Sequence, residues 1–233
     1  MRLKSALRRG VAAAVIAGVV VSSGIPAYAG TWDIANGDIT VKGASDESGN
    51  YNKVKQGDKD FEKDEGETVI TGESDKNTVT IDTSGGKVDV TFDDLKIDAS
   101  DKGKAAVRVE GGHDATIELD GDNKLKSGSH NAGLEKNGNE SSGKLTIKDD
   151  NDTKGSLTAK GGEGGGAGIG GGIKSTGSSI TIRGGTIKAV GGSNAAGIGD
   201  GAGRATGPTD DPNPGDLYIC GDAEVTAKAG SQM

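Results

Sequence analysis

The sequence has few of the residues that usually hold a small domain together. Cys220 is the single cysteine, so no disulfide can form within the chain. Aromatic residues make up only 3% of the 233 residues, and there are 4 prolines. Because large rings are so scarce, stability has to come from backbone pairing and from the packing of small aliphatic side chains.

Long apolar runs are absent after the first thirty residues. Residues 1–29 have four basic residues within the first nine positions, then an apolar stretch of about a dozen residues, and end with the small residues Ala27 and Ala29. The apolar stretch is shorter than the roughly 20 residues that span a bilayer. We therefore predict a signal peptide cleaved at Ala29 and a secreted, extracellular or cell-surface-associated protein whose mature chain has no membrane span.

The remaining chain is poor in positive charge. After residue 29 it has 23 basic and 35 acidic residues, a net charge of −12. Binding of nucleic acid through its phosphates requires a basic surface. We therefore expect no nucleic acid among the partners.

Glycine is abundant, with 43 residues, and it alternates with short β-branched segments such as ATIEL, KLTIK and SITIR. Equivalent isoleucines at 117, 147, 182 and 219 are separated by 30, 35 and 37 residues. Short strands that recur at such a period, with glycine corners between them, are typical of a solenoid. We predict an all-β parallel β-helix with three short strands per coil, in which the glycine-rich stretch 161–172 is a corner.

Alternating residues of a strand face the same side, so the pattern also predicts the interior. The first wall should contain Ala115, Ile117, Leu145, Ile147, Ile180, Ile182, Leu217 and Ile219. The second should contain Leu125, Leu157, Ile187 and Val225 with Ala159, Ala189 and Ala227, and the third Val107, Leu134, Ile169 and Ile198.

The two ends of the repeat differ. Residues 30–76 depart from the repeat and are charged, so we expect an irregular N-terminal cap, with Trp32 in its core or, as the alternative, a ligand-stacking platform. The repeats then occupy residues 77–233. We expect either self-association through the strands of Leu217–Ala227, because unpaired strand edges promote association, or a frayed last coil.

Several segments together resemble a known family. WDIANGDITV, VITG, NTVTID, GDNKLKSG, AGLEKN and GGTIKAVGG followed by AAGIGDG are similar to the exported Gly-rich β-helix surface proteins of clostridia and related Gram-positive bacteria, of the carbohydrate-binding-domain type. The resemblance implies a right-handed parallel β-helix on an extracellular protein, usually without assigned catalysis.

Two groups of residues are candidates for a site. The segment DDNDTKG approaches a calcium loop, so Asp149, Asp150 and Asp152 could bind calcium, although Lys154 occupies a ligand position. Thr116, Thr146, Thr181 and Tyr218 fall between inward residues at equivalent positions and should stack in one outward row. Rows of hydroxyls on a rigid wall can hydrogen-bond a polymer, but threonine is also a common strand former.

The function we expect is a non-catalytic glycan-binding or surface adhesion module whose partner is an extracellular polysaccharide or glycan. A structural spacer of the cell surface is the alternative. A polysaccharide lyase or hydrolase comes third, because the paired aspartates look like solvated turns and a hydrolase needs two carboxylates about 5 to 9 Å apart. We expect no catalytic residues and no cofactor other than calcium.

Overall fold

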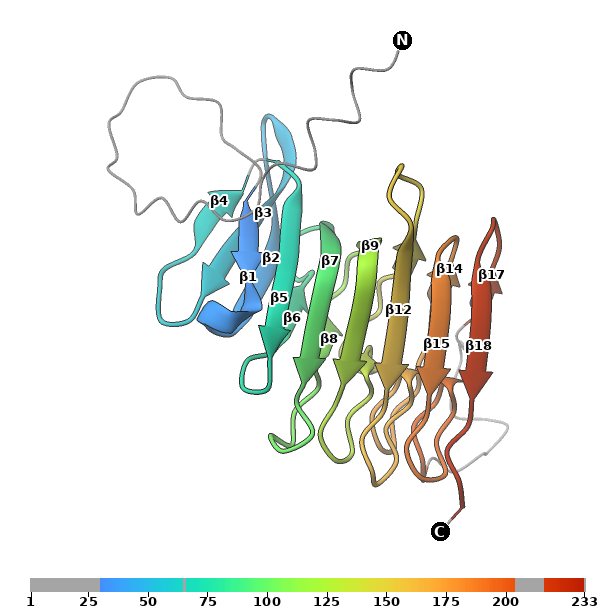
Figure 1. Ribbon diagram of the computed structural model, residues 1–233. Helices are drawn as coiled ribbons and strands as arrows, with labels where there is room; N and C mark the ends of the chain where they lie inside the picture. Colours follow the sequence, from blue (N-terminus) through green and yellow to red (C-terminus); the bar gives the residue numbers. More distant parts are fainter. Residues whose placement is uncertain (1–29, 65, 204–215, 233) are drawn as a thin grey trace.

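The protein is a solenoid of parallel strands. The computed structural model describes residues 30–64, 66–203 and 216–232; the predicted signal peptide with Ala29 lies outside them. Strands from successive coils lie side by side along one axis, as Figure 1 shows. Within the described residues they form a 10-stranded and an 8-stranded sheet. The predicted all-β parallel β-helix is confirmed.

The first wall runs the length of the molecule, and each of its strands pairs in parallel with the next. Its strands are β1 (Thr31–Asp33), β5 (Thr68–Ser74), β7 (Val88–Asp98), β9 (Ala115–Lys126), β11 (Leu145–Lys148), β14 (Ile180–Ile182) and β17 (Leu217–Ile219).

The second wall belongs to the same sheet. It contains β12 (Gly155–Lys160), β15 (Thr186–Val190) and β18 (Glu224–Lys228), and β12 pairs with the second half of β9. The prediction of three short strands in every coil is therefore wrong for the coils of β7 and β9, where one long strand crosses both walls. At the corner of β9 near Gly121 a single extra residue shifts the register against β7, so pairing continues through it, whereas residues 149–154 separate β11 from β12.

The third wall is the 8-stranded sheet. Its parallel strands are β2 (Ile39–Asp46), β6 (Val79–Asp82), β8 (Val107–Glu110), β10 (Leu134–Glu135), β13 (Ile169–Gly170) and β16 (Ile198–Gly199). At its N-terminal end β3 (Gly49–Gln56) and β4 (Glu62–Asp64) continue the sheet in antiparallel pairing.

Stacked aliphatic side chains fill the space between the walls. Ile147 pairs with Ile182, which pairs with Ile219, and Ile117 pairs with Ile147, as predicted. The predicted interior residues of the coils from β8 to β15 are buried. In the final coil the prediction is wrong: Leu217 is 44% and Ile219 49% exposed, because no further described coil covers them.

One position of the second wall departs from the aliphatic pattern. Leu157 pairs with Asn123, and Leu125 pairs with Ala159. Asn123 is fully buried, and its amide donates to the carbonyls of Asp120 and Ser156 while its oxygen accepts from the Leu95 N–H at 2.8 Å. A buried amide at a bend satisfies backbone groups that the turning ladder leaves unpaired.

The region predicted as a cap, residues 30–76, is partly solenoid. A three-residue 3₁₀ turn, η1 (Ile34–Asn36), connects β1 and β2, and both strands pair in parallel with the following coil. The antiparallel β3–β4 extension has the character of a cap. Trp32 is buried in the core, and its indole donates to Asp64 at 3.1 Å, so it does not form an exposed stacking platform.

Glycine is required at the corner 161–172 because backbones approach closely there. A Cβ on Gly168 would lie 2.5 Å from the carbonyl oxygen of Gly197 and 2.5 Å from the Val190 nitrogen. Real Cβ atoms do not come so near to backbone atoms, so any larger residue would push two coils apart.

Candidate functional site

The predicted outward residues of the first wall form one continuous row. Thr116 pairs with Thr146, Thr146 with Thr181, and Thr181 with Tyr218. The row, called the hydroxyl row below, therefore places one hydroxyl on each of four adjacent coils. Neighbouring strands lie about 4.8 Å apart, so the hydroxyls repeat at that interval along the axis.

A second outward row lies two residues earlier on the same coils. Asp114, Lys144, Ser179 and Asp216 directly precede β9, β11, β14 and β17, so they occupy the equivalent position in each coil. The Asp114 carboxylate accepts from the Lys144 N–H at 2.8 Å. Negative, positive, neutral and negative groups thus follow one another beside the hydroxyl row.

An open pocket joins the two rows near the C-terminal coils. It has a volume of about 430 Å³. The residues that line it are Gly112, Asp114, Ser142, Gly143, Lys144, Ser179, Thr181, Asp216 and Tyr218. The pocket therefore contains the two C-terminal members of the hydroxyl row, together with donors and acceptors of both charges.

Tyr218 is the most exposed large side chain of this wall. Its side chain is 59% exposed, and its hydroxyl donates to the Asp216 carboxylate at 3.3 Å. A tyrosine held in this way offers an apolar ring face and a polar edge to the same ligand.

The predicted calcium residues do not form a metal site. Asp150 is paired with Lys148 at 2.6 Å, and this hydrogen bond lowers the pKa of its carboxyl. Lys148 also contacts Glu118 at 2.7 Å, so one ammonium group neutralises both of these carboxylates. Within the described part of the chain, no three His, Cys, Asp or Glu residues are arranged to hold a metal ion.

The third wall also contains a buried charged cluster that the sequence analysis did not predict. Glu135 and Lys136 are 1% and 0% exposed. The Glu135 carboxylate contacts Arg108 at 2.8 Å and accepts from the Ala132 N–H at 3.0 Å. Burial raises the pKa of Glu135, and these two donors oppose the shift.

Lys136 points into the solenoid. Its ammonium donates to the carbonyls of Ser141 at 3.0 Å and Ser178 at 2.9 Å, which belong to adjacent coils. Burial lowers the pKa of Lys136 to about 8, and the charge of Asp114 partly offsets this. The alternation after Leu134 could have revealed it, since Lys136 is two residues further on and shares the inward face. Glu135 and Lys136 are buried from solvent, and the hydrogen bonds of Lys136 connect two adjacent coils.

One outward carboxyl is also perturbed. The pKa of Asp93 is raised by burial and then by the charges of Asp94 and Asp120. Asp93 pairs with Asp120 across β7 and β9, so two carboxylates are adjacent at this corner. A raised carboxyl pKa is one property that a general acid needs, so Asp93 is the residue to test for acid catalysis.

Comparison with known proteins adds no relative: no family model, no curated protein and no solved structure matches the chain. The resemblance to Gly-rich β-helix surface proteins therefore stays a prediction from the sequence. Among the described residues, no helix has the length and apolar character needed to cross a bilayer.

Proposed function

We propose that this protein is a non-catalytic, exported glycan-binding module whose site is the hydroxyl row with the adjoining pocket. The observation that carries the proposal is the coincidence of the two: the pocket lies where the row ends in Thr181 and Tyr218. An extended glycan running along the solenoid axis would meet a similar polar group at every coil.

The chemistry of this wall suits a sugar chain. Each threonine hydroxyl can donate one hydrogen bond and accept others, as sugar hydroxyls do. Lys144 and Asp216 add charged groups, whose hydrogen bonds are stronger than those of neutral groups. The exposed ring of Tyr218 provides an apolar face for the C–H side of a sugar ring.

Rigidity is a further argument for binding at this wall. The hydroxyls lie on paired strands whose inward neighbours, such as Ile147 and Ile182, are fully buried. Ordering a surface side chain on binding has an entropic cost, and strands that are already fixed reduce it. A flat, preorganised row can therefore bind an extended polymer without a deep cleft.

A glycan array with the mature protein, followed by calorimetry with the best oligosaccharide found, tests the proposal. The Thr181→Val and Tyr218→Ala substitutions together should weaken binding at least about tenfold, or about 1.4 kcal/mol. The matched control combines Thr153→Val with Tyr51→Ala, which alter an exposed turn and the N-terminal hairpin. It should bind as the unmodified protein does. Equal binding by both variants would place the site elsewhere.

The two alternatives give different outcomes. A structural spacer would show no glycan binding in the array and would lose nothing through either variant. A lyase or hydrolase would release reducing ends or unsaturated products from a polysaccharide, and the perturbed carboxyl makes Asp93→Asn the variant that should stop it. Turnover abolished by Asp93→Asn would overturn the non-catalytic assignment.

A further inference from the structure

The second wall carries a concentration of lysines that is unexpected in an acidic chain. Its outward residues fall into two adjacent rows that cross several coils. One row is Lys96, Lys124, Thr158, Lys188 and Thr226, and the other is Asp98, Lys126, Lys160, Val190 and Lys228. β12, β15 and β18 present this face side by side in Figure 1.

Two lysines of the earlier coils are neutralised within the protein. Lys124 pairs with Asp122 at 2.6 Å, and Lys126 pairs with Asp98 at 3.0 Å. These carboxylates lie on the same face, so this part of the wall has little net charge.

The lysines of the last three coils are different. Lys160, Lys188 and Lys228 are exposed, and no carboxylate of the described chain forms an ion pair with any of them. The one acidic residue on this part of the wall is Glu224. It lies diagonally across from Lys188 on the adjacent strand and four residues before Lys228 on β18, and it forms an ion pair with neither, so three lysines face one carboxylate. The face of β12, β15 and β18 is thus positive.

We infer that this face, defined by Lys160, Lys188 and Lys228 and called the lysine face below, binds an anionic polysaccharide. The three ammonium groups alternate between the two rows on consecutive coils, so they follow the solenoid axis in a zigzag. Thr158 and Thr226 fill the alternate positions and supply neutral hydrogen-bonding groups between the charges. Repeated cations separated by hydroxyls complement a polymer with regular carboxylates or sulfates and many hydroxyls.

Nucleic acid fits this face less well. Recognition of unpaired bases uses aromatic side chains for stacking, and the outward positions of β12, β15 and β18 are Ser, Thr, Lys, Val and Glu. The inference concerns a different wall from the hydroxyl row and does not depend on binding there.

Immobilised polygalacturonate and dextran sulfate serve as the anionic probes, with dextran as the neutral one and duplex DNA as the non-glycan polyanion. We expect binding to at least one acidic polysaccharide, weakening with added salt because counterions are released and screened. The two acidic probes distinguish carboxylate from sulfate as the preferred group.

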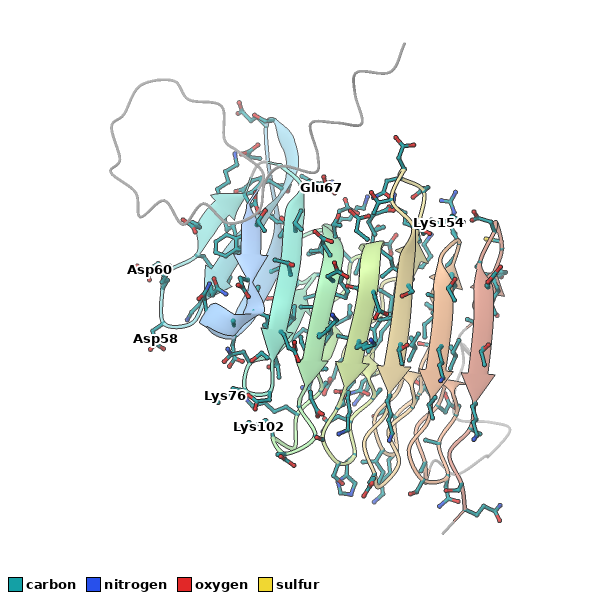
Figure 2. All side chains as sticks on the ribbon, in the orientation of Figure 1. Asp58, Asp60, Glu67, Lys76, Lys102 and Lys154 are labelled. Carbon is teal, nitrogen blue, oxygen red and sulfur yellow. The ribbon has the colours of Figure 1, made fainter. Side chains whose placement is uncertain are left out.

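The decisive variant combines Lys160→Gln, Lys188→Gln and Lys228→Gln. It should lose at least about tenfold in affinity for the acidic polysaccharide. The control combines Lys59→Gln, Lys76→Gln and Lys102→Gln, which remove the same charge from exposed turns; Figure 2 shows Lys76 and Lys102 in the loops that follow β5 and β7. It should retain binding, and unchanged melting curves would show that both variants are folded.

Three results would overturn the inference: no binding to either acidic polysaccharide, equal loss in the two triple variants, or duplex DNA bound as tightly as the polysaccharide. The Thr181→Val and Tyr218→Ala variant separates this test from the previous one. It should keep its salt-dependent binding to the acidic probe. The proposals for the hydroxyl row and for the lysine face are therefore tested independently.

Discussion

At the scale of single residues, the most unusual group is the ammonium of Lys136, which is buried between two coils. It is held by the carbonyls of Ser141 and Ser178, and burial brings its pKa to about 8. In the unfolded chain the pKa returns to its ordinary value near 10.5. Between these two values the unfolded chain binds more protons than the folded protein.

This difference predicts how stability changes with pH. The free energy of unfolding should rise as the pH is raised from about 8 to about 10.5, by up to about 3 kcal/mol. Denaturant unfolding at pH 7.5, 8.5 and 9.5 measures it, with Lys136→Met as the comparison, since that variant should lack this rise. Parallel pH curves for the two proteins would mean that Lys136 is solvated.

Ile182 tests the packing of the first wall. It is fully buried between Ile147 and Ile219, so Ile182→Asp would place an unpaired charge in the interior. We expect a loss of roughly 3–5 kcal/mol, the usual cost of an uncompensated buried charge. Thr181→Asp, one residue away on the outward side, should cost much less. Circular-dichroism melts of the two variants measure the difference, and equal melts would refute the register.

Gly168 tests the close approach at the glycine corner. Gly168→Ala should destabilise the protein by about 1–3 kcal/mol, because its Cβ would contact two backbone atoms of the next coil. Ser193→Ala, in the neighbouring corner, should change stability by less than about 0.5 kcal/mol. Denaturant unfolding of the two variants gives the free energy of unfolding of each. Equal losses would show that the corner has room to relax.

At the scale of elements, the outermost strands β17 and β18 determine how the solenoid meets other molecules. Leu217 and Ile219 are exposed, although their partners Ile180 and Ile182 are buried. Among the described residues, the outer edges of β17 and β18 have no strand partner, and such edges can pair with another chain. We predict that the protein self-associates through Leu217–Ala227 or that this coil opens readily.

Light scattering coupled to size exclusion, with hydrogen exchange of residues 216–229, tests this prediction. Leu217→Lys with Ile219→Lys should shift any dimer toward monomer, whereas Lys76→Gln, at a distant turn, should not. A strict monomer with fully protected amides in β17 and β18 would contradict the prediction.

The strands also show which parts of the fold can be predicted from the sequence. The alternation in ATIEL, KLTIK and SITIR was sufficient for the walls and their register, because side chains point to opposite faces with a period of two. Pairing through the corner of β9 was not predictable in the same way. It depends on the number of residues at each corner, since β7 and β9 differ there by only one residue and the ladder continues across the register shift.

At the scale of the whole molecule, polar residues buried at inward positions are harder to predict than aliphatic ones. Asn123 and Lys136 are polar residues at inward positions, and their burial depends on carbonyls contributed by other coils. The hydroxyl row was predicted because it needs only register, whereas the pocket beside it depends on how the corners at Asp114, Ser142 and Asp216 come together. The lysine face likewise depends on the register between β12, β15 and β18, which places Lys160, Lys188 and Lys228 on one surface.

The binding of a glycan along the hydroxyl row is the central claim, and mapping amide chemical shifts by NMR tests it most directly. The mature protein is titrated with the best oligosaccharide from the array, and shifts are followed for Thr116, Thr146, Thr181 and Tyr218. We predict changes at Thr146, Thr181 and Tyr218 together, on three adjacent coils, with little change at inward residues of the third wall such as Leu134. Saturable changes confined to another wall, or none at any concentration of the oligosaccharide, would contradict the claim.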